Sequence, residues 1–230
     1  MKLFRPIALA AILATTFALP ACESGGAKTD PSQPSPPPGA NNAEDLAAVR
    51  ETWARYERAL ETRDGATVVA TLTENSYPYY ANLLHVALDG SRAEVEALPL
   101  PAKWEVLNMR QRCTRSQLAS MDAKQYVAFA TDEGWYVGND ATPFEKLTSG
   151  ANRAVGVVKH PSESKTYQFI FRRVNGRWLF DEPSCHGYYA DLYDAAARAE
   201  GVPPTQHILG MIAEESGQPI RAGIWDPMPQ

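Results

Sequence analysis

Few residues in this 230-residue chain have the types and spacing that catalysis or metal binding requires. The four histidines are His85, His160, His186 and His207, and no two of them stand at a metal-ligand spacing. The chain has no His-x-x-x-His or Cys-x-x-Cys motif, no Gly-rich phosphate loop and no Gly-x-Ser-x-Gly motif. The sequence therefore predicts neither a metal site nor a cofactor.

Acid–base chemistry in a pocket is the remaining kind of reaction to consider. An isomerase needs a carboxylate or imidazole base together with a hydrogen-bond donor such as a tyrosine. The weak candidates for these roles are Glu182, His85 and Tyr80. Residues of these types more often serve the core or the surface of a protein than catalysis. Further pocket candidates, aromatic or acidic, are Tyr77, Tyr79, Asp132, Trp135, Tyr167, Phe169, Phe171, Trp178, Phe180 and Asp181.

Helices are predicted to position the first half of these residues. In segment 44–63, apolar residues at spacings of three and four, including Trp53, Tyr56 and Leu60, form one stripe. Further helices are predicted over 66–72, 80–88, 103–112 and 123–133, and one begins at the capping box 91–94. A strand over 126–130 is the alternative for part of the last segment. After the strands, helices are predicted over 188–199 and 205–215, with an irregular tail from 217.

Strands are predicted over 144–148, 154–159, 166–174 and 177–182. The last two form a hairpin around Asn175-Gly176, which favours a two-residue turn with positive φ. Counting back from that turn pairs Phe171 with Phe180 and Phe169 with Glu182, so Tyr167, Phe169, Phe171, Trp178 and Phe180 share one face. Glu182 ends this aromatic face, which makes it the best base candidate, but we expect it in water at the sheet edge.

The order of these elements resembles the nuclear-transport-factor-2-like superfamily. The resemblance is carried by Trp53, Tyr56 and Leu60 on the first helix, and by Phe169-Ile170-Phe171 continuing through Asn175-Gly176-Arg177-Trp178-Leu179-Phe180-Asp181. It implies an α+β fold in which N-terminal helices pack on a curved, cone-like antiparallel sheet of about four strands, here with extra C-terminal helices. It also implies an apolar pocket between sheet and helices, which family members use as isomerases, polyketide cyclases, dehydratases or non-catalytic binding modules.

The first 21 residues are typical of an export signal. Lys2 and Arg5 precede the uncharged stretch 7–19, which is short for a membrane span. Leu19-Pro20-Ala21-Cys22 then resembles the lipobox of bacterial lipoproteins. The resemblance implies a diacylglyceryl group on the Cys22 sulfur and cleavage before that residue. Cleavage by an ordinary signal peptidase is the alternative, but Leu19 occupies the position where that enzyme prefers a small side chain.

Residues 22–42 are predicted to be a spacer behind the lipidated cysteine. The segment is rich in proline and serine, includes Pro36-Pro37-Pro38, and has no apolar side chain larger than alanine beyond Cys22. Such a segment cannot bury a core, and its prolines favour an extended chain. Residues 43–230 are then one domain, long enough to bury a core.

Two cysteines remain if Cys22 carries lipid. Cys113 and Cys185 would be an even pair in an oxidising compartment, which favours a disulfide between them. Two separate buried thiols are the alternative. His186, next to Cys185, could lower the pKa of that thiol, but a disulfide is the more natural use of the sulfur in an exported chain.

These features predict a membrane-anchored lipoprotein that faces the periplasm and acts as a non-catalytic binding or assembly module. Glu23 follows Cys22, whereas an aspartate retains enteric lipoproteins in the inner membrane, so the outer membrane is favoured. The expected partners are the membrane and a small apolar ligand or an envelope protein. The net charge of −5 and the lack of a basic cluster argue against nucleic acid. A pocket-based isomerase, cyclase or dehydratase, and a structural envelope protein without a small ligand, are the alternatives.

Mass spectrometry of the intact protein, purified from its own membrane, tests the anchor. We expect a chain that begins at Cys22 and carries acyl groups, because several buried chains, at about 0.8 kcal/mol per methylene, make anchoring stable. A soluble protein from the cell interior that still has its first 21 residues would contradict this prediction.

Overall fold

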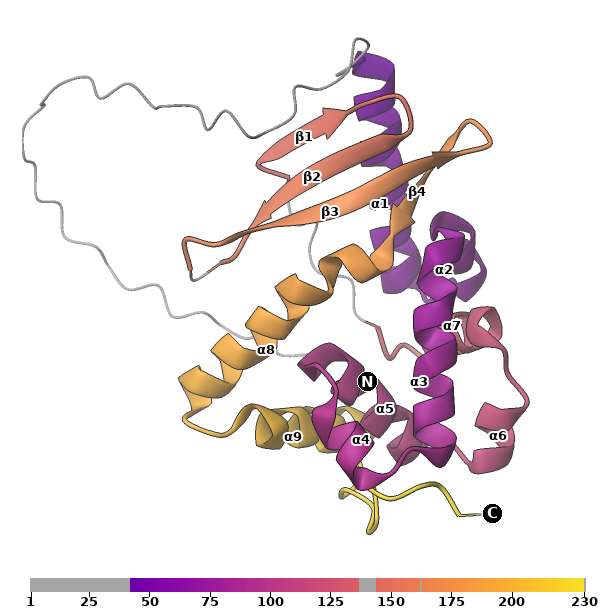
Figure 1. Ribbon diagram of the computed structural model, residues 1–230, viewed down its shortest axis with the longest axis vertical. Coiled ribbons are helices and arrows are strands. Elements are labelled where there is room, and N and C mark those ends of the chain that lie inside the picture. Colours follow the sequence, from indigo (N-terminus) through magenta and orange to yellow (C-terminus); the bar gives the residue numbers. More distant parts are fainter. Residues whose placement is uncertain (1–41, 137–143, 162, 230) are drawn as a thin grey trace, which may run out of the picture. The chain divides into compact units, whose positions relative to one another are not determined.

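The computed structural model describes residues 42–136, 144–161 and 163–229. The predicted signal peptide, Cys22 and nearly all of the predicted spacer lie outside these residues. In the described part, helices precede and follow one antiparallel sheet (Figure 1). The helices before the sheet are α1 (Ala43–Thr62), α2 (Gly65–Thr71), η1 (Glu74–Ser76), α3 (Tyr77–Asp89), α4 (Arg92–Ala97), α5 (Leu100–Arg112), α6 (Arg115–Ala119) and α7 (Ala123–Asp132).

The second half supplies the sheet and two longer helices. These elements are β1 (Lys146–Ser149), β2 (Arg153–Lys159), β3 (Thr166–Val174), β4 (Arg177–Asp181), η2 (Glu182–Cys185), α8 (His186–Glu200) and α9 (Pro204–Ser216). The strands are antiparallel and follow one another in the order β1-β2-β3-β4. The predicted α+β class, with helices packed on a four-stranded antiparallel sheet and further helices at the C-terminus, is confirmed.

Local capping explains where several helices begin. Ser91 and Asp122 each form a reciprocal capping box with the residue three positions on, as their sequence contexts predict. The strand considered for 126–130 is wrong, because Tyr126, Val127 and Ala130 are buried at helical spacing behind the Asp122 cap. The short helix α6, which the sequence prediction missed, begins at a third capping box formed by Thr114.

The hairpin of β3 and β4 has the predicted register. Asn175 and Gly176 both have positive φ, and Phe171 lies opposite Phe180. The predicted pairing of Phe169 with Glu182 does not form, because β4 ends at Asp181 and the chain turns into η2. Glu182 therefore leaves the sheet at the point where the aromatic face ends.

One aromatic cluster joins α1 to the sheet. The ring of Trp53 lies 5.2 Å from Phe180, 5.4 Å from Phe169 and 5.6 Å from Phe144 between centroids. Tyr188 of α8 contacts Phe169 at 5.6 Å, so α1 and α8 cover the same face of the sheet (Figure 1). Aromatic pairs at these distances add stability beyond the area that they bury.

Two arginines tie the C-terminal tail to the helices. The guanidinium of Arg110, 1% exposed, donates to the carbonyls of Val86, Ala87, Gly90 and Ile224 at 2.6–3.3 Å. These bonds give the carbonyls at the end of α3 a side-chain donor and hold the segment after α9 against that helix. Trp225 is only partly buried and lies under the guanidinium of Arg92, whereas Ile224 and Met228 are buried.

The predicted disulfide between Cys113 and Cys185 is absent, and both are buried free thiols. Cys113 ends α5 beside Arg112 and Glu133, whereas Cys185 lies in η2 under Glu182. The two sulfurs thus belong to different regions of the core, and a disulfide needs a short, specific approach of the two residues. The alternative of two separate buried thiols is the one observed.

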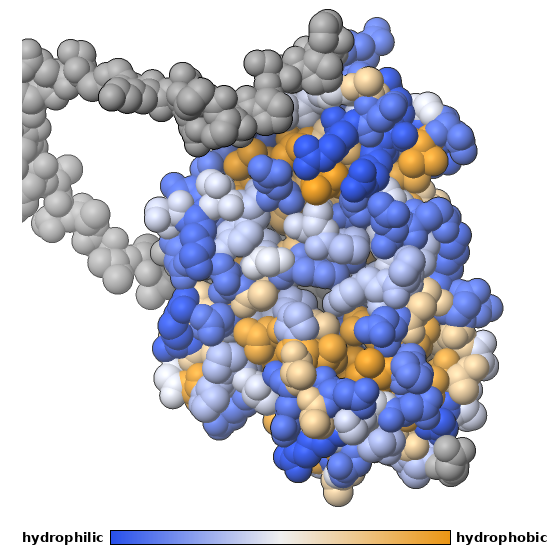
Figure 2. Space-filling view, viewed as in Figure 1, coloured by the Kyte–Doolittle hydropathy of each residue, from blue (hydrophilic) through white to orange (hydrophobic). Residues whose placement is uncertain are grey.

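The surface shows where apolar side chains gather. On the face shown in Figure 2, hydrophobic residues form a band over the helical half and smaller patches near the sheet, each interrupted by hydrophilic residues. Among the described residues, Val174 is the one large hydrophobic residue that counts as exposed, and its exposed fraction is 41%. In the same part of the chain, no helix is both long and apolar enough to cross a membrane.

Replacing Trp53 with alanine tests the role of the aromatic cluster. We expect Trp53→Ala to lower the free energy of unfolding by about 3–5 kcal/mol, because it removes a large buried ring and leaves a cavity. Urea denaturation measures the loss. The exposed Arg55→Ala on the same helix is the control and should change stability by less than about 0.5 kcal/mol. Equal effects of the two variants would contradict the assignment.

Candidate functional site

A cavity of about 270 Å³ lies among the helices rather than under the sheet. Its wall comes from α1, α2, α3, α5, α7, η2, α8 and α9, with two residues that follow α7. Figure 1 shows how α3, α5, α8 and α9, four of the helices that contribute to this wall, are arranged. This volume is close to the lower end of the range of small-molecule sites, about 300 Å³.

Aromatic rings make up much of the wall. The aromatic lining residues are Tyr56, Tyr79, Tyr80, Trp104, Trp135, Tyr136, Tyr189 and Tyr193. Burial raises the pKa of Tyr56, Tyr80 and Tyr136 well above that of a free phenol. These side chains therefore remain neutral phenols at physiological pH.

Helix α5 carries a carboxylate into this aromatic wall. Every residue from Ala102 to Arg110 is buried, because α3, α8 and α9 all pack against this helix. Glu105 lies in the middle of that stretch and is 4% exposed. Its Oε1 accepts a hydrogen bond from the hydroxyl of Tyr126 at 2.6 Å and another from the hydroxyl of Tyr136.

The environment of Glu105 favours its protonated form. Burial raises the pKa of Glu105 to about 7; the two tyrosine hydroxyls lower it, and the nearby charge of Glu182 raises it further. A carboxyl group with this pKa exchanges its proton near neutral pH. It can therefore act as an acid or a base, or bind a charged ligand in one protonation state.

Glu182 brings a second carboxylate to the cavity. It is 8% exposed, and its Oε1 lies 2.9 Å from Nε2 of His186, one turn further along the chain. Burial lowers the pKa of His186, but the hydrogen bond and charge of Glu182, together with Glu105, raise it overall. The other oxygen of Glu182, Oε2, is buried and has no hydrogen-bond partner in the described part of the chain.

His186 is also held by an aromatic ring. Tyr79 packs on its imidazole at 4.2 Å between centroids. The same two residues line a second cavity, of about 200 Å³, on the side of α4 and the start of α5. Tyr79 and His186 thus belong to the walls of both cavities. The ring of Tyr79 on one side and the carboxylate of Glu182 on the other fix the orientation of the imidazole.

Cys185 has no sign of an activated thiol. Its Sγ contacts the backbone carbonyl of Glu182 at 2.9 Å, and burial, followed by the charge of Glu182, raises the pKa of the thiol well above its ordinary value. The imidazole of His186 bonds to the carboxylate of Glu182 instead. Activation of Cys185 by its neighbour His186 is therefore not what this geometry provides.

The structure brings together four residues named from the sequence. Glu182, Tyr79, Tyr80 and Trp135 all line the cavity. The expectation that Glu182 lies at a sheet edge in water is wrong, because the turn into η2 carries it inward.

Other predicted site residues lie elsewhere. The side chain of His85 is 73% exposed and lies near Asp89, so it is not a base in this cavity. Tyr77 donates its hydroxyl to the carbonyl of Val69. Asp132 accepts from the backbone N–H of Gly65, and Asp181 pairs with Arg172.

The aromatic face of the hairpin belongs to the core rather than to the cavity. Phe169, Phe171, Trp178 and Phe180 are buried against α1 and α8 and are absent from the cavity wall. The resemblance implied a pocket between sheet and helices, next to this aromatic face. In the structure, Trp53 and Tyr188 fill that space.

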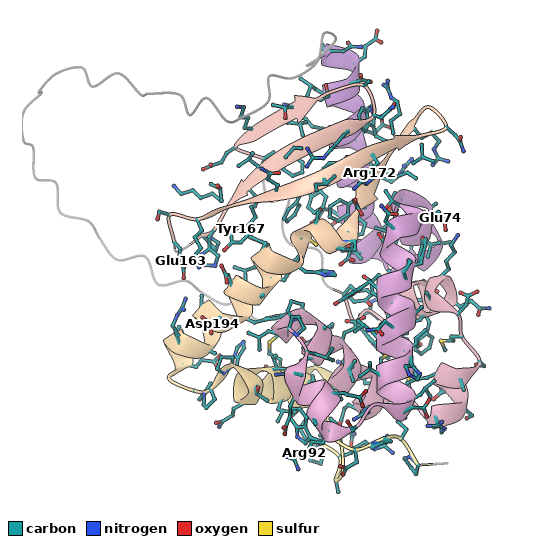
Figure 3. The ribbon with its side chains drawn as sticks, in the orientation of Figure 1. Glu74, Arg92, Glu163, Tyr167, Arg172 and Asp194 are labelled. Atoms are coloured by element: carbon teal, nitrogen blue, oxygen red, sulfur yellow. The ribbon has the colours of Figure 1, made fainter. Side chains whose placement is uncertain are left out.

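Tyr167 also serves the packing of α8. It extends from β3 toward that helix, and its hydroxyl donates to Asp191 (Figure 3). Glu163, near it, pairs with Lys165 and with Arg198 at the far end of α8. These contacts hold α8, and with it His186, against the sheet.

The sequence prediction missed Glu105, Tyr136 and the use of His186. Glu105 lies in a helix that is buried on every side, so no amphipathic pattern marked it as facing inward. The spacing of four between Glu182 and His186 was a usable signal, since residues so spaced meet on a helix. Among the described residues, no group of three His, Cys, Asp or Glu side chains is arranged to hold a metal ion.

Comparisons of the sequence and the structure with known proteins found no match. No family model matches the sequence, no curated protein matches it, and no solved structure matches the fold. The resemblance to the nuclear-transport-factor-2-like superfamily stays a prediction.

The pH dependence of stability tests the environment of Glu105. Its pKa is higher in the folded chain, about 7, than its ordinary value of 4.5, so the folded state binds more protons between these values. Stability conferred by protonated Glu105 is present below about pH 4.5 and is lost as pH rises through 7, by up to about 3 kcal/mol. The free energy of unfolding, measured by urea denaturation, should fall between pH 5 and pH 8 in the unaltered chain. In Glu105→Gln this fall should be much smaller, because glutamine does not titrate.

Glu61→Gln, an exposed change on α1, is the control and should keep the pH dependence of the unaltered chain. If Glu105→Gln and the unaltered chain lose the same stability between pH 5 and pH 8, Glu105 does not titrate near neutrality.

Proposed function

We propose that this domain binds a small molecule in its helix-lined cavity, on a chain that is exported and anchored to a membrane through lipid on Cys22. The observation that supports binding is the cavity itself, with Glu105 and Glu182 buried in its wall. Protein interiors are normally close-packed, and buried carboxylates cost stability. An unfilled cavity and two buried carboxylates both cost folding stability. Binding of a ligand gives a reason for their presence that stability of the fold does not.

Docking of a protein on an apolar surface has less support than binding inside the cavity. On the face shown in Figure 2, the apolar patches are interrupted by hydrophilic residues. Val174, the one large and well-exposed hydrophobic residue described, lies at the end of the hairpin, far along β3 from its contacts with α8. The small-ligand form of the binding hypothesis is therefore the one that we adopt.

Acid–base catalysis on the bound molecule is the second candidate function. It is favoured by Glu105, whose pKa of about 7 suits proton exchange at neutral pH. The hydroxyls of Tyr126 and Tyr136 both donate to Glu105, so neither is free to polarise a substrate carbonyl at the same time. Binding without reaction is for this reason placed first.

Filling the cavity tests the proposal. Leu192 lines the cavity from α8 and is partly buried, so Leu192→Trp should occupy the void. Ligand-observed NMR with a set of small amines, alcohols and acids should show at least one compound that binds the unaltered chain and binds Leu192→Trp at least tenfold more weakly. An enzyme would also convert that compound, and the same spectra would show its loss.

Leu209→Trp is the matched control, because Leu209 is a partly buried leucine on α9 that packs on the core and is absent from the cavity wall. It should bind the compound like the unaltered chain. Binding that survives in Leu192→Trp, or a complete lack of binding to the unaltered chain, would overturn the proposal.

A further inference from the structure

We propose that the cavity takes a small organic ammonium cation, such as a quaternary or tertiary amine. This inference rests on the proposed function, since it names the ligand class of the same cavity. Three features carry it: the sign of the charges in the wall, an unpartnered carboxylate oxygen, and the aromatic lining.

The ionisable side chains in the described wall, apart from the tyrosines, are mostly acidic. They are Glu105, Glu182 and Glu215, with His186 as the single basic group. No lysine or arginine belongs to the described wall. An anionic ligand would therefore face like charges, whereas a cation would be attracted.

The acidic groups are not all neutralised by the protein. Glu215 pairs with Arg112 at 3.4 Å, and Glu182 pairs with His186 through Oε1. Among the described residues, no basic side chain forms a salt bridge with Glu105. With Glu105 ionised, the wall has an excess of negative charge even when His186 is protonated.

Glu182 supplies a second, independent sign of an absent partner. The residue is 8% exposed and lines the cavity, yet its Oε2 has no hydrogen-bond partner in the described chain. A buried polar atom without a partner costs roughly 1–3 kcal/mol, more if charged. Glu182 is the one carboxylate of the described wall with such an oxygen, and Trp104 Nε1 is a second unpartnered atom there. An ammonium ligand would offset the charge of this carboxylate.

The aromatic wall is suited to a cation that is poorly hydrated. The faces of tyrosine and tryptophan rings attract cations, most strongly when these are desolvated. Trp135 already has such a contact, since the guanidinium of Arg112 lies 5.5 Å from the ring centroid. A metal ion would instead need several oxygen or nitrogen ligands at close range, and no such group exists among the described residues.

The test compares two molecules of the same shape and different charge. Choline has a quaternary ammonium group, and 3,3-dimethylbutan-1-ol replaces its nitrogen with carbon. Isothermal titration of each into the full chain, at pH 8, should show choline binding at least tenfold more tightly than the alcohol. This comparison uses the unaltered protein, so it does not depend on the folding of any variant.

Variants then locate the charge that matters. Glu105→Gln keeps the size of the side chain and an oxygen that can accept from Tyr126, so it should weaken choline binding about tenfold and leave binding of the alcohol unchanged. Glu182→Gln should act in the same direction. The exposed Glu61→Gln is the control and should bind both molecules like the unaltered chain.

Cation binding should also release a proton near pH 7. A bound cation favours ionised Glu105, which is half protonated at that pH, and titrations in buffers of different ionisation enthalpy would measure the release. Other titratable side chains from several elements lie around Glu105, and their charges act on it too. They are Tyr79 and Tyr80 (α3), Tyr126 (α7), Tyr136 (after α7), Glu182 (η2), and His186 and Tyr193 (α8), with Glu215 (α9) beside them. Glu105→Gln should reduce the release.

The outcomes separate the ligand class from the function. If the alcohol binds as tightly as choline, and Leu192→Trp weakens both, the cation proposal is overturned and the small-molecule cavity stands. If choline does not bind at all, the cation proposal is overturned as well, and the proposed function is decided by the Leu192→Trp comparison with the wider compound set. Choline binding that Glu105→Gln and Glu182→Gln both leave intact would also overturn it.

Discussion

The packing of Trp53 against the aromatic face of the sheet is the interaction on which the rest of the structure depends. Its ring contacts Phe169, Phe171 and Phe180 at 5.2–6.4 Å, so α1 cannot move without disturbing β3 and β4. With β4 fixed, the chain turns at Asp181 and delivers Glu182 to the cavity. The same cluster fills the space on the aromatic side of the sheet, and the cavity of about 270 Å³ lies among the helices instead.

The cavity owes its chemistry to a conflict between burial and charge. Desolvation opposes the ionisation of Glu105, and two tyrosine hydroxyls only partly compensate. Glu182 has a different partner, because its carboxylate accepts from His186 and stabilises the charged form of that imidazole. Two carboxylates in one cavity thus have different environments, one bonded to phenols and one to an imidazole.

Local signals predicted the elements well where they act within a few residues. The caps at Ser91 and Asp122 and the turn at Asn175-Gly176 each satisfied their own backbone requirements, and the register of the hairpin followed from the turn. The predicted end of the last strand at Glu182 was one residue too long, and that one residue decides whether this carboxylate faces water or the cavity. The disulfide was predicted from the even number of cysteines in an exported chain. That number carries no information on the distance between Cys113 and Cys185 in the fold.

The sequence by itself determined the α+β class, the longer helices and the strands in their order, and the aromatic face of β3 and β4, because periodicity and turn chemistry are local. Only the tertiary structure decided that this face is core, that the hollow lies among α3, α5 and α8, and that Glu105 belongs to it. Helix α5 is buried on all sides, so its polar residues carry no pattern that distinguishes a cavity from a core. Which buried side chains meet is set by the packing of helices distant in sequence, and that information is not local.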